Sequence, residues 1–145
     1  MITIQLQKEI EAPPEFVFDL LADQNRFPTW DPNFIEASLT TDGPIRKGST
    51  GTTVGVMMGR RVENEIYYDA YDRPSFVSGG TSSGTVMAKN SVKFTPSERG
   101  TQIDFHLQVK LKGMMRLFEV FIKPVILKEK EESLNALDDY IAKNC

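Results

Sequence analysis

Residues 101–144 read TQIDFHLQVKLKGMMRLFEVFIKPVILKEKEESLNALDDYIAKN, and within this stretch the hydrophobic pattern changes its period. Apolar and polar residues alternate up to residue 112, which predicts a strand with one buried face. After Gly113 the pattern becomes helical to about Lys143, with Leu134, Leu137 and Ile141 on one stripe. The stretch therefore predicts a strand that leads directly into a long C-terminal helix.

Upstream of this stretch, alternation at residues 2–10 predicts another strand. Prolines at 13 and 14 then favour a helix over residues 12–23, because proline suits the first turn of a helix. Residues 26–32 are too few and too rich in proline for a long element, so we expect a brief second helix that ends before Pro32. From Asn33 onward the pattern is strand-like and is interrupted by turn residues. We expect strands near 33–41, 50–58, 61–71, 75–81, 84–95 and 101–112. Short turns between them favour an antiparallel meander.

Five segments follow one another along the chain: Ile10–Leu21, Trp30–Pro32, the Gly48 and Gly51 region, Tyr71–Pro74 and Leu127–Glu132. In this order they resemble the polyketide cyclase/dehydrase and lipid-transport branch of the START-like superfamily. The resemblance covers essentially the whole chain, residues 1–145, and implies one domain. It also implies an α+β helix-grip fold, in which a seven-stranded curved antiparallel sheet wraps a long C-terminal helix, with two short helices after the first strand. An apolar cavity between sheet and helix is part of that expectation.

Composition limits the functions that we expect. A net charge of −3 and a pI near 5.2 give no broad positive surface, so nucleic acid is not an expected partner. With one histidine and a single cysteine, Cys145, we expect no metal site, no intrachain disulfide and a cytoplasmic location. No glycine motif for phosphates or dinucleotides is present, so we expect no cofactor. The most apolar stretch, Gly113–Leu127, carries charges and is too short to cross a bilayer.

Period-two alternation also predicts which side chains face the interior of the sheet. On the strand near 50–58 it places Thr52, Val54 and Val56 inward. Together with apolar residues in the first half of the last helix, the inward positions give our candidate ligand-binding residues. These are Val54, Val56, Asn64, Ile66, Tyr68, Phe76, Ala88, Asn90, Val92, Phe105, Leu107, Phe118, Phe121 and Val125.

Few of the predicted inward residues could move a proton. The only histidine, His106, falls on the outward face of the last strand. Asn64, Tyr68 and Asn90 fall on inward faces and need partners, either a ligand, a water or the protein itself. The charged run 128–132 has the pattern of a solvated helix face.

Binding or transport of a small hydrophobic ligand, of the lipid, isoprenoid or aromatic polyketide class, is therefore the leading hypothesis. A polyketide cyclase or dehydratase that uses Asn64, Tyr68 and Asn90 is one alternative. A protein-interaction module is the other, and it rests on analogy with the superfamily.

The last helix contains one anomaly. Leu127, Leu134 and Leu137 define one stripe, whereas apolar residues between 114 and 125 cluster nearly opposite it. Because proline interrupts helices, we expect a break near Lys123-Pro124. Residues 113–123 would then be a mobile lid, or an exposed surface for a homodimer (through residues 114–123) or a membrane. The alternative is that the break lets both stripes pack within one monomer.

Overall fold

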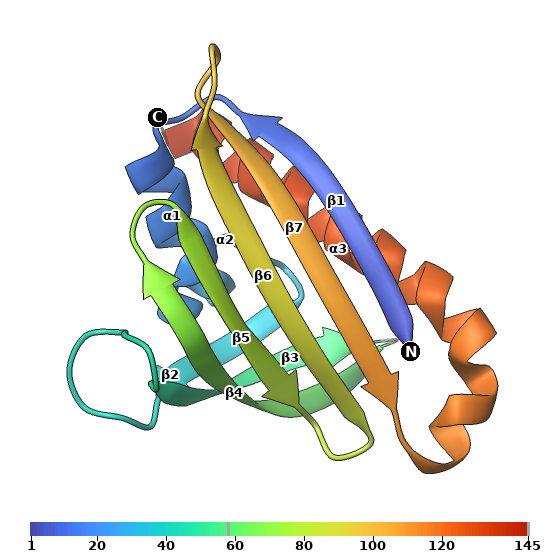
Figure 1. The fold of residues 1–145 in the computed structure, drawn as a ribbon. Helices are drawn as coiled ribbons and strands as arrows, with labels where there is room; N and C mark the ends of the chain where they lie inside the picture. Colours follow the sequence, from blue (N-terminus) through green and yellow to red (C-terminus); the bar gives the residue numbers. More distant parts are fainter. Residues whose placement is uncertain (58, 145) are drawn as a thin grey trace.

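The computed structural model describes residues 1–57 and 59–144, and it has the predicted helix-grip architecture (Figure 1). The elements are, in order, β1 (Ile2–Ile10), α1 (Pro14–Ala22), the 3₁₀ helix η1 (Gln24–Arg26), α2 (Phe27–Trp30), β2 (Phe34–Leu39), β3 (Thr50–Met57), β4 (Arg60–Asp72), β5 (Phe76–Ser82), β6 (Val86–Pro96), β7 (Thr101–Leu111), the 3₁₀ helix η2 (Gly113–Phe118) and α3 (Glu119–Asn144). The α+β fold class predicted from the sequence is confirmed.

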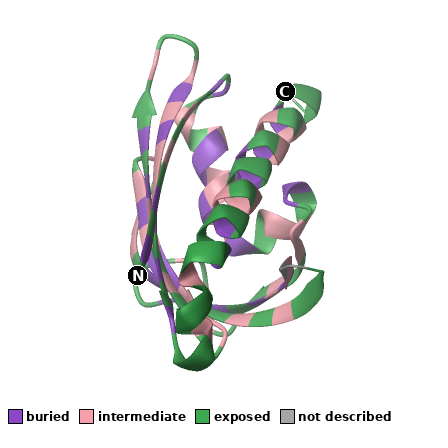
Figure 2. Cartoon of the chain, turned by 90° about the vertical axis from the view of Figure 1, so that its right-hand side faces the viewer, coloured by how far each residue is buried: buried purple, intermediate pink, exposed green. Residues whose placement is uncertain are grey.

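The seven strands form one antiparallel sheet in the order β1-β7-β6-β5-β4-β3-β2. The first strand closes the meander by pairing with the last, from Ile2 opposite Val109 to Ile10 opposite Thr101. Figure 1 shows β2 and β3 turned across the direction of β1 and β7, so that the sheet curves. Helix α3 lies against the concave face, and Figure 2 shows the buried residues on the sides of sheet and helix that face each other.

The buried apolar residues form two separate clusters. The first joins α1 and α2 to the sheet and to the end of α3, and Phe18, Trp30 and Leu137 are among its members. The second lies under the start of α3, where Ile122 and Ile126 pack against β1 and β7. A core that is divided in this way leaves room between its two parts for a cavity.

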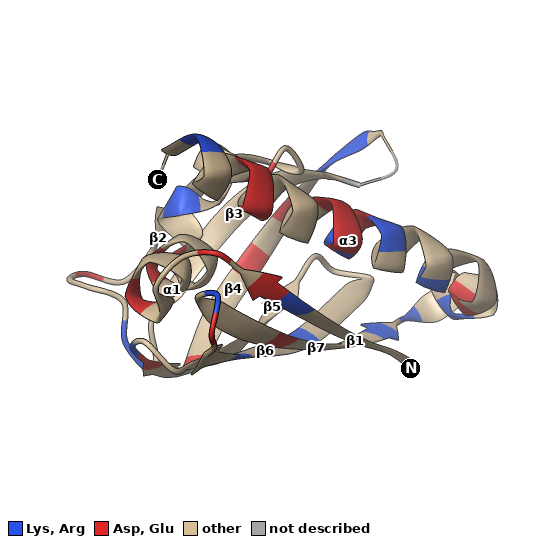
Figure 3. Ribbon diagram, turned by 90° about the horizontal axis from the view of Figure 1, so that it is seen from above, with Lys and Arg blue, Asp and Glu red and all other residues tan. Residues whose placement is uncertain are grey.

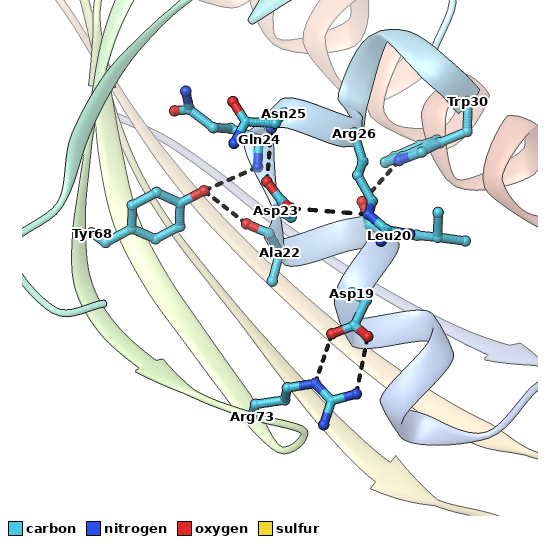
Figure 4. A network of polar contacts seen from close by, with 10 residues as sticks. All are labelled: Asp19, Leu20, Ala22, Asp23, Gln24, Asn25, Arg26, Trp30, Tyr68 and Arg73. Carbon is cyan, nitrogen blue, oxygen red and sulfur yellow. Dashed lines mark hydrogen bonds and ion pairs between the residues drawn. The ribbon is translucent and has the colours of Figure 1, made fainter. Parts of the chain in front are cut away.

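A network of polar contacts fastens α1 and α2 to the sheet beside the first cluster (Figure 4). The Tyr68 hydroxyl donates to the Ala22 carbonyl at 2.8 Å and accepts from the Gln24 backbone N–H at 3.1 Å. The Trp30 indole donates to the Leu20 carbonyl at 2.8 Å. These bonds occupy the carbonyl groups near the C-terminus of α1, which would otherwise lack partners inside the protein.

The predicted break at Lys123-Pro124 is wrong, because α3 runs without interruption from Glu119 to Asn144. The irregular turns come earlier, in η2. Proline at position 124 removes the hydrogen bond to the carbonyl of Val120, four residues before it. Val120 is 81% exposed, so water can satisfy that carbonyl and the helix continues.

Candidate ligand-binding cavity

A cavity of about 210 Å³ lies between the sheet and α3, and it is bordered by both hydrophobic clusters. Val77 and Val92 belong to the first cluster and line one part of it. Leu107, Val109 and Ile126 belong to the second and line another part. The cavity is therefore lined mainly by apolar side chains, both aliphatic and aromatic, and suits an apolar ligand.

Most of the candidate residues predicted from the sequence border this cavity. They are Val56, Asn64, Ile66, Tyr68, Ala88, Asn90, Val92, Phe105 and Leu107. Strands β4, β6 and β7 follow the predicted alternation, since Ile66, Val92 and Leu107 are buried while their neighbours are less so. Val54, Phe76, Phe118, Phe121 and Val125 do not border the cavity.

Strand β3 departs from the prediction at Thr52 and Val54, although Val56 does border the cavity. Thr53 is buried and pairs with the inward residue Asn64, whereas Val54 pairs with Glu63 on the outer face and Thr52 is exposed. The inward positions on either side of Thr53 are glycines, which carry no apolar side chain for the pattern to detect. Gly55 is needed there, because a Cβ would lie 2.7 Å from the Asn33 carbonyl oxygen.

Two physical reasons explain why the other predicted residues lie away from the cavity. Phe76 pairs with Asp72 and Lys93 on the outer face of the sheet, and the next residue, Val77, is the buried one. Two glycines in β5 interrupt the alternation of apolar and polar side chains, so the sequence did not indicate which face of this strand is buried. Phe118, Phe121 and Val125 are exposed, because the start of α3 turns Ile122 and Ile126 towards the sheet instead.

Polar groups that the sequence did not single out gather at one part of the wall. The Asp31 carboxylate accepts a hydrogen bond from the Asn33 backbone N–H at 2.9 Å, and the Asn33 amide donates to the Ser133 hydroxyl on α3 at 3.2 Å. Ser133 lies one helical turn beyond Glu129, and all four residues line the cavity. Asp31 had the pattern of a turn residue before Pro32, so no sequence signal marked it.

Thr53 supplies an unused polar group on the same cavity wall. Its side chain is 2% exposed, and its Oγ1 has no hydrogen-bond partner among the described residues. A buried hydroxyl without a partner costs about 1–3 kcal/mol. A water or a polar atom of a ligand would remove that cost.

Glu129 and Lys130 place ionisable groups at the cavity, so the prediction of a fully solvated face for 128–132 is wrong at these two positions. Loss of solvent around the Glu129 carboxyl raises its pKa above the ordinary 4.5, and the Asp31 carboxylate adds to this, while Lys130 opposes it. Of the residues that border the cavity, Glu129 is thus a carboxyl whose pKa is shifted towards neutrality.

Neither Tyr68 nor His106 is placed to donate a proton into the cavity, as Glu129 is. Both hydrogen-bonding positions of the Tyr68 hydroxyl are occupied by α1 and η1, and burial raises its pKa further above the ordinary value. His106 pairs with Gln5 and Ser91 on the outer face, as predicted. The tyrosine therefore holds the fold together rather than serving the cavity.

The sequence matches the model of one protein family over residues 1–142, and that family is described as polyketide cyclase / dehydrase and lipid transport. The chain belongs to this family. The resemblance predicted from the order of its motifs is confirmed. No curated protein matches the sequence.

Solved structures support the same fold for this polyketide cyclase/dehydrase and lipid-transport family member. The protein TTHA0849 from Thermus thermophilus superposes with a TM-score of 0.79 at 18% identity, over 98% of each chain. A protein of unknown function from Staphylococcus aureus, SA2116, gives 0.78 at 15% identity, over 99% of this chain and 94% of that one. Ara h 8.0201 gives 0.74 at 17% identity, over 97% of each chain. Sequence identities this low support a shared fold and no statement about function.

In residues 1–57 and 59–144, no three or more histidine, cysteine, aspartate or glutamate side chains come close enough to hold a metal ion. Cys145, which entered the expectation about disulfides, lies outside the described residues. Over the same described residues, no helix combines the length and the hydrophobicity that a membrane crossing requires.

Proposed function

We propose that this protein binds a small amphipathic molecule in the cavity between the sheet and α3. The observation that carries the proposal is the combination of a mainly apolar cavity with the buried, unpartnered hydroxyl of Thr53 on its wall. A purely apolar occupant would leave that hydroxyl unsatisfied. An occupant with one polar end and an apolar body satisfies both parts of the wall.

The distribution of polar groups suggests how such a ligand lies. Thr53 and Asn64 are opposite residues on β3 and β4, so their Cβ atoms lie about 4.5–5.5 Å apart. The side-chain amides of Asn64 and Asn90 make no hydrogen bond to another described residue, which leaves them free for a ligand. We place the polar end of the ligand at the Thr53–Asn64 pair and its hydrocarbon body against the valines and leucines.

The volume narrows the class of ligand. A cavity of about 150 Å³ is large enough to hold benzene. At about 210 Å³, this cavity suits a one-ring or small two-ring phenol, a short isoprenoid alcohol or a medium-chain fatty compound. A lipid with two long acyl chains would extend well beyond a cavity of this volume.

Native mass spectrometry of the protein as purified from cells tests the proposal. We expect a fraction of the protein to carry one small molecule. Ala88 lines the cavity, so Ala88→Phe should fill it and abolish the adduct. Met87→Phe is the matched control, because its neighbour Met87 is 40% exposed on the outer face of β6. An adduct that survives Ala88→Phe and disappears in Met87→Phe would contradict a cavity site.

A second function, proton transfer in a cyclase-type or dehydratase-type reaction, is favoured by Glu129. A carboxyl with a raised pKa at a cavity keeps its proton to a higher pH than an ordinary glutamate does, and it can deliver that proton to a bound substrate. Incubation with the retained molecule, followed by chromatography coupled to mass spectrometry, would detect loss of water as a change in mass and ring closure without loss of water as a change in retention. Turnover that Glu129→Gln abolishes and the exposed control Glu131→Gln preserves supports this function, whereas turnover unaffected by Glu129→Gln contradicts it.

A further inference from the structure

The start of α3 and the preceding η2 expose large apolar side chains that make no contribution to the core. Met114 is 76% exposed, Leu117 77%, Val120 81% and Phe121 74%. They follow one another within a little more than two helical turns, and Phe118 beside them is 48% exposed. We call these five residues the apolar surface. Exposed aliphatic and aromatic groups at this density mark an interaction site in a soluble domain.

Cations surround the apolar surface. Residues 110–128 carry five cationic side chains, at Lys110, Lys112, Arg116, Lys123 and Lys128, in a chain whose net charge is −3. Figure 3 shows this positive charge along the end of β7 and the start of α3. None of the five forms an ion pair with another described residue.

The one carboxylate within this segment is already neutralised. Glu119 lies 2.6 Å from the amino group of Met1, which forms an ion pair with it. The cations around the apolar surface are thus without an internal counter-charge from Glu119. A partner of this surface must therefore offer both an apolar region that these side chains can enter and negative charge that pairs with the cations.

From this arrangement we propose that the apolar surface docks on a lipid bilayer that contains anionic lipids. Phenylalanine, leucine and valine side chains enter the boundary between headgroups and acyl chains, while the lysines and Arg116 contact phosphate and carboxylate groups. The proposal does not depend on the identity of the ligand. The same helix reaches the cavity one to two turns later, through Ile126 and Glu129.

A second copy of this chain fits the surface less well. A two-fold dimer sets the same patch of both copies against each other. The five cations of one copy would then face the five of the other, with no carboxylate besides Glu119 in either segment to separate them. Like charges brought together at an interface oppose association.

Vesicle flotation tests the docking. The purified protein is mixed with phosphatidylcholine vesicles that contain either no anionic lipid or roughly 30% phosphatidylserine. We expect binding to the anionic vesicles only. It should weaken by more than about tenfold when NaCl rises from about 0.1 M to about 1 M, because the screening length falls from about 10 Å to about 3 Å.

Surface variants identify the docking residues without disturbing the core. Arg116→Glu combined with Lys123→Glu reverses two charges, and we expect a loss of more than about tenfold in vesicle binding. Val120→Ser combined with Phe121→Ser should give a similar loss. Lys47→Glu and Ile35→Ser are matched controls at exposed positions far from this segment in the sequence, and they should bind as the original protein does.

Three results would overturn the assignment. The first is no flotation of the original protein with anionic vesicles. The second is equal binding by the segment variants and the control variants. The third is a dimer in light scattering that Phe121→Ser dissociates, which would assign the surface to a second copy of the chain. A further variant, Leu117→Trp, should show a blue-shifted indole emission with anionic vesicles, and unchanged emission would count against insertion.

Discussion

The two ends of the long helix treat the same kinds of side chain in opposite ways. Near its C-terminus, Phe18 is fully buried and makes edge contacts with Tyr71 and Phe94 at centroid distances of 5.0 and 5.1 Å. At its N-terminus, Phe121 is 74% exposed and Phe118 lies beside it in the solvent. Phe18 belongs to α1 and lies in the buried cluster that packs against the C-terminal half of α3, whereas the rings at the other end of the helix are exposed.

Polar groups differ between the regions as well. Around α1, the buried tyrosine and tryptophan both donate hydrogen bonds to backbone carbonyls. At the cavity, the Thr53 hydroxyl is buried with no partner among the described residues. In the first region the protein itself supplies the partners of the tyrosine and the tryptophan, although the Gln24 Oε1 beside them is also buried without a partner among the described residues. The cavity and the apolar surface are the parts at which we propose that an occupant binds.

The largest expected effect is the loss of stability when the buried ring of Phe18 is removed. Phe18→Ala should lower the free energy of unfolding by about 3–5 kcal/mol, because it removes a fully buried aromatic side chain and leaves a cavity. Phe121→Ala, at an exposed position, should change it by no more than about 0.5 kcal/mol. Urea denaturation measures both values, and losses of equal size would remove the contrast between the two ends.

The second effect concerns the tyrosine that joins β4 to α1. Tyr68→Phe deletes the hydroxyl and leaves the Ala22 carbonyl and the Gln24 N–H without their partner, so we expect a loss of about 1–3 kcal/mol. Tyr67→Phe on the same strand is the control, since no hydrogen bond of that hydroxyl to a described residue is present. If Tyr68→Phe proves as harmless as the control in thermal denaturation, the network is not what fastens α1.

The third expected effect is a gain in stability instead of a loss. Thr53→Val replaces the unpartnered hydroxyl with a methyl group of similar size, and the ligand-free protein should gain about 1 kcal/mol. Thr52→Val, on the outer face, should be nearly neutral. The same Thr53→Val protein should retain less ligand in native mass spectrometry. Unchanged stability together with unchanged ligand retention would show that Thr53 is not a binding group.

The smallest expected effect is a dependence of the free energy of unfolding on pH, through Glu129. The raised pKa means that the folded protein holds the Glu129 proton more tightly than the unfolded chain does. The stabilisation is complete below the ordinary pKa of 4.5 and is lost as the pH rises through the raised value. Compared with the original protein, Glu129→Gln should therefore gain stability as the pH rises from about 4 to about 7. Exposed Glu131→Gln should show no such trend, and parallel pH profiles for all three proteins would argue against a desolvated Glu129.

The sequence predicted well wherever each buried face carries apolar side chains. β4, β6 and β7 alternate clearly, and their cavity residues lie where the pattern placed them. It failed at β3 and β5, because glycines occupy inward positions to make room for the Asn33 backbone and for close strand packing. It also missed the polar part of the wall, since Asp31 and Glu129 come together only through the tertiary fold.

The start of α3 shows another limit of the pattern. Two incompatible apolar stripes were evident from the sequence, and the exposure of one of them is now observed. Pro124 suggested the wrong cause, because a local rule about proline could not show that solvent satisfies the freed Val120 carbonyl. What the two stripes contact depends on the curvature of the sheet, which no local pattern encodes.

Nuclear magnetic resonance of the backbone amides tests the central claim, that the cavity is the ligand site, most directly. The ligand-free protein would be titrated with one-ring and two-ring phenols, short isoprenoid alcohols and medium-chain fatty compounds. We predict that at least one class shifts the amide signals of cavity residues such as Thr53, Asn64 and Ala88, and that Ala88→Phe abolishes these shifts. Shifts confined to residues 114–121, or no shift with any class, would contradict the claim.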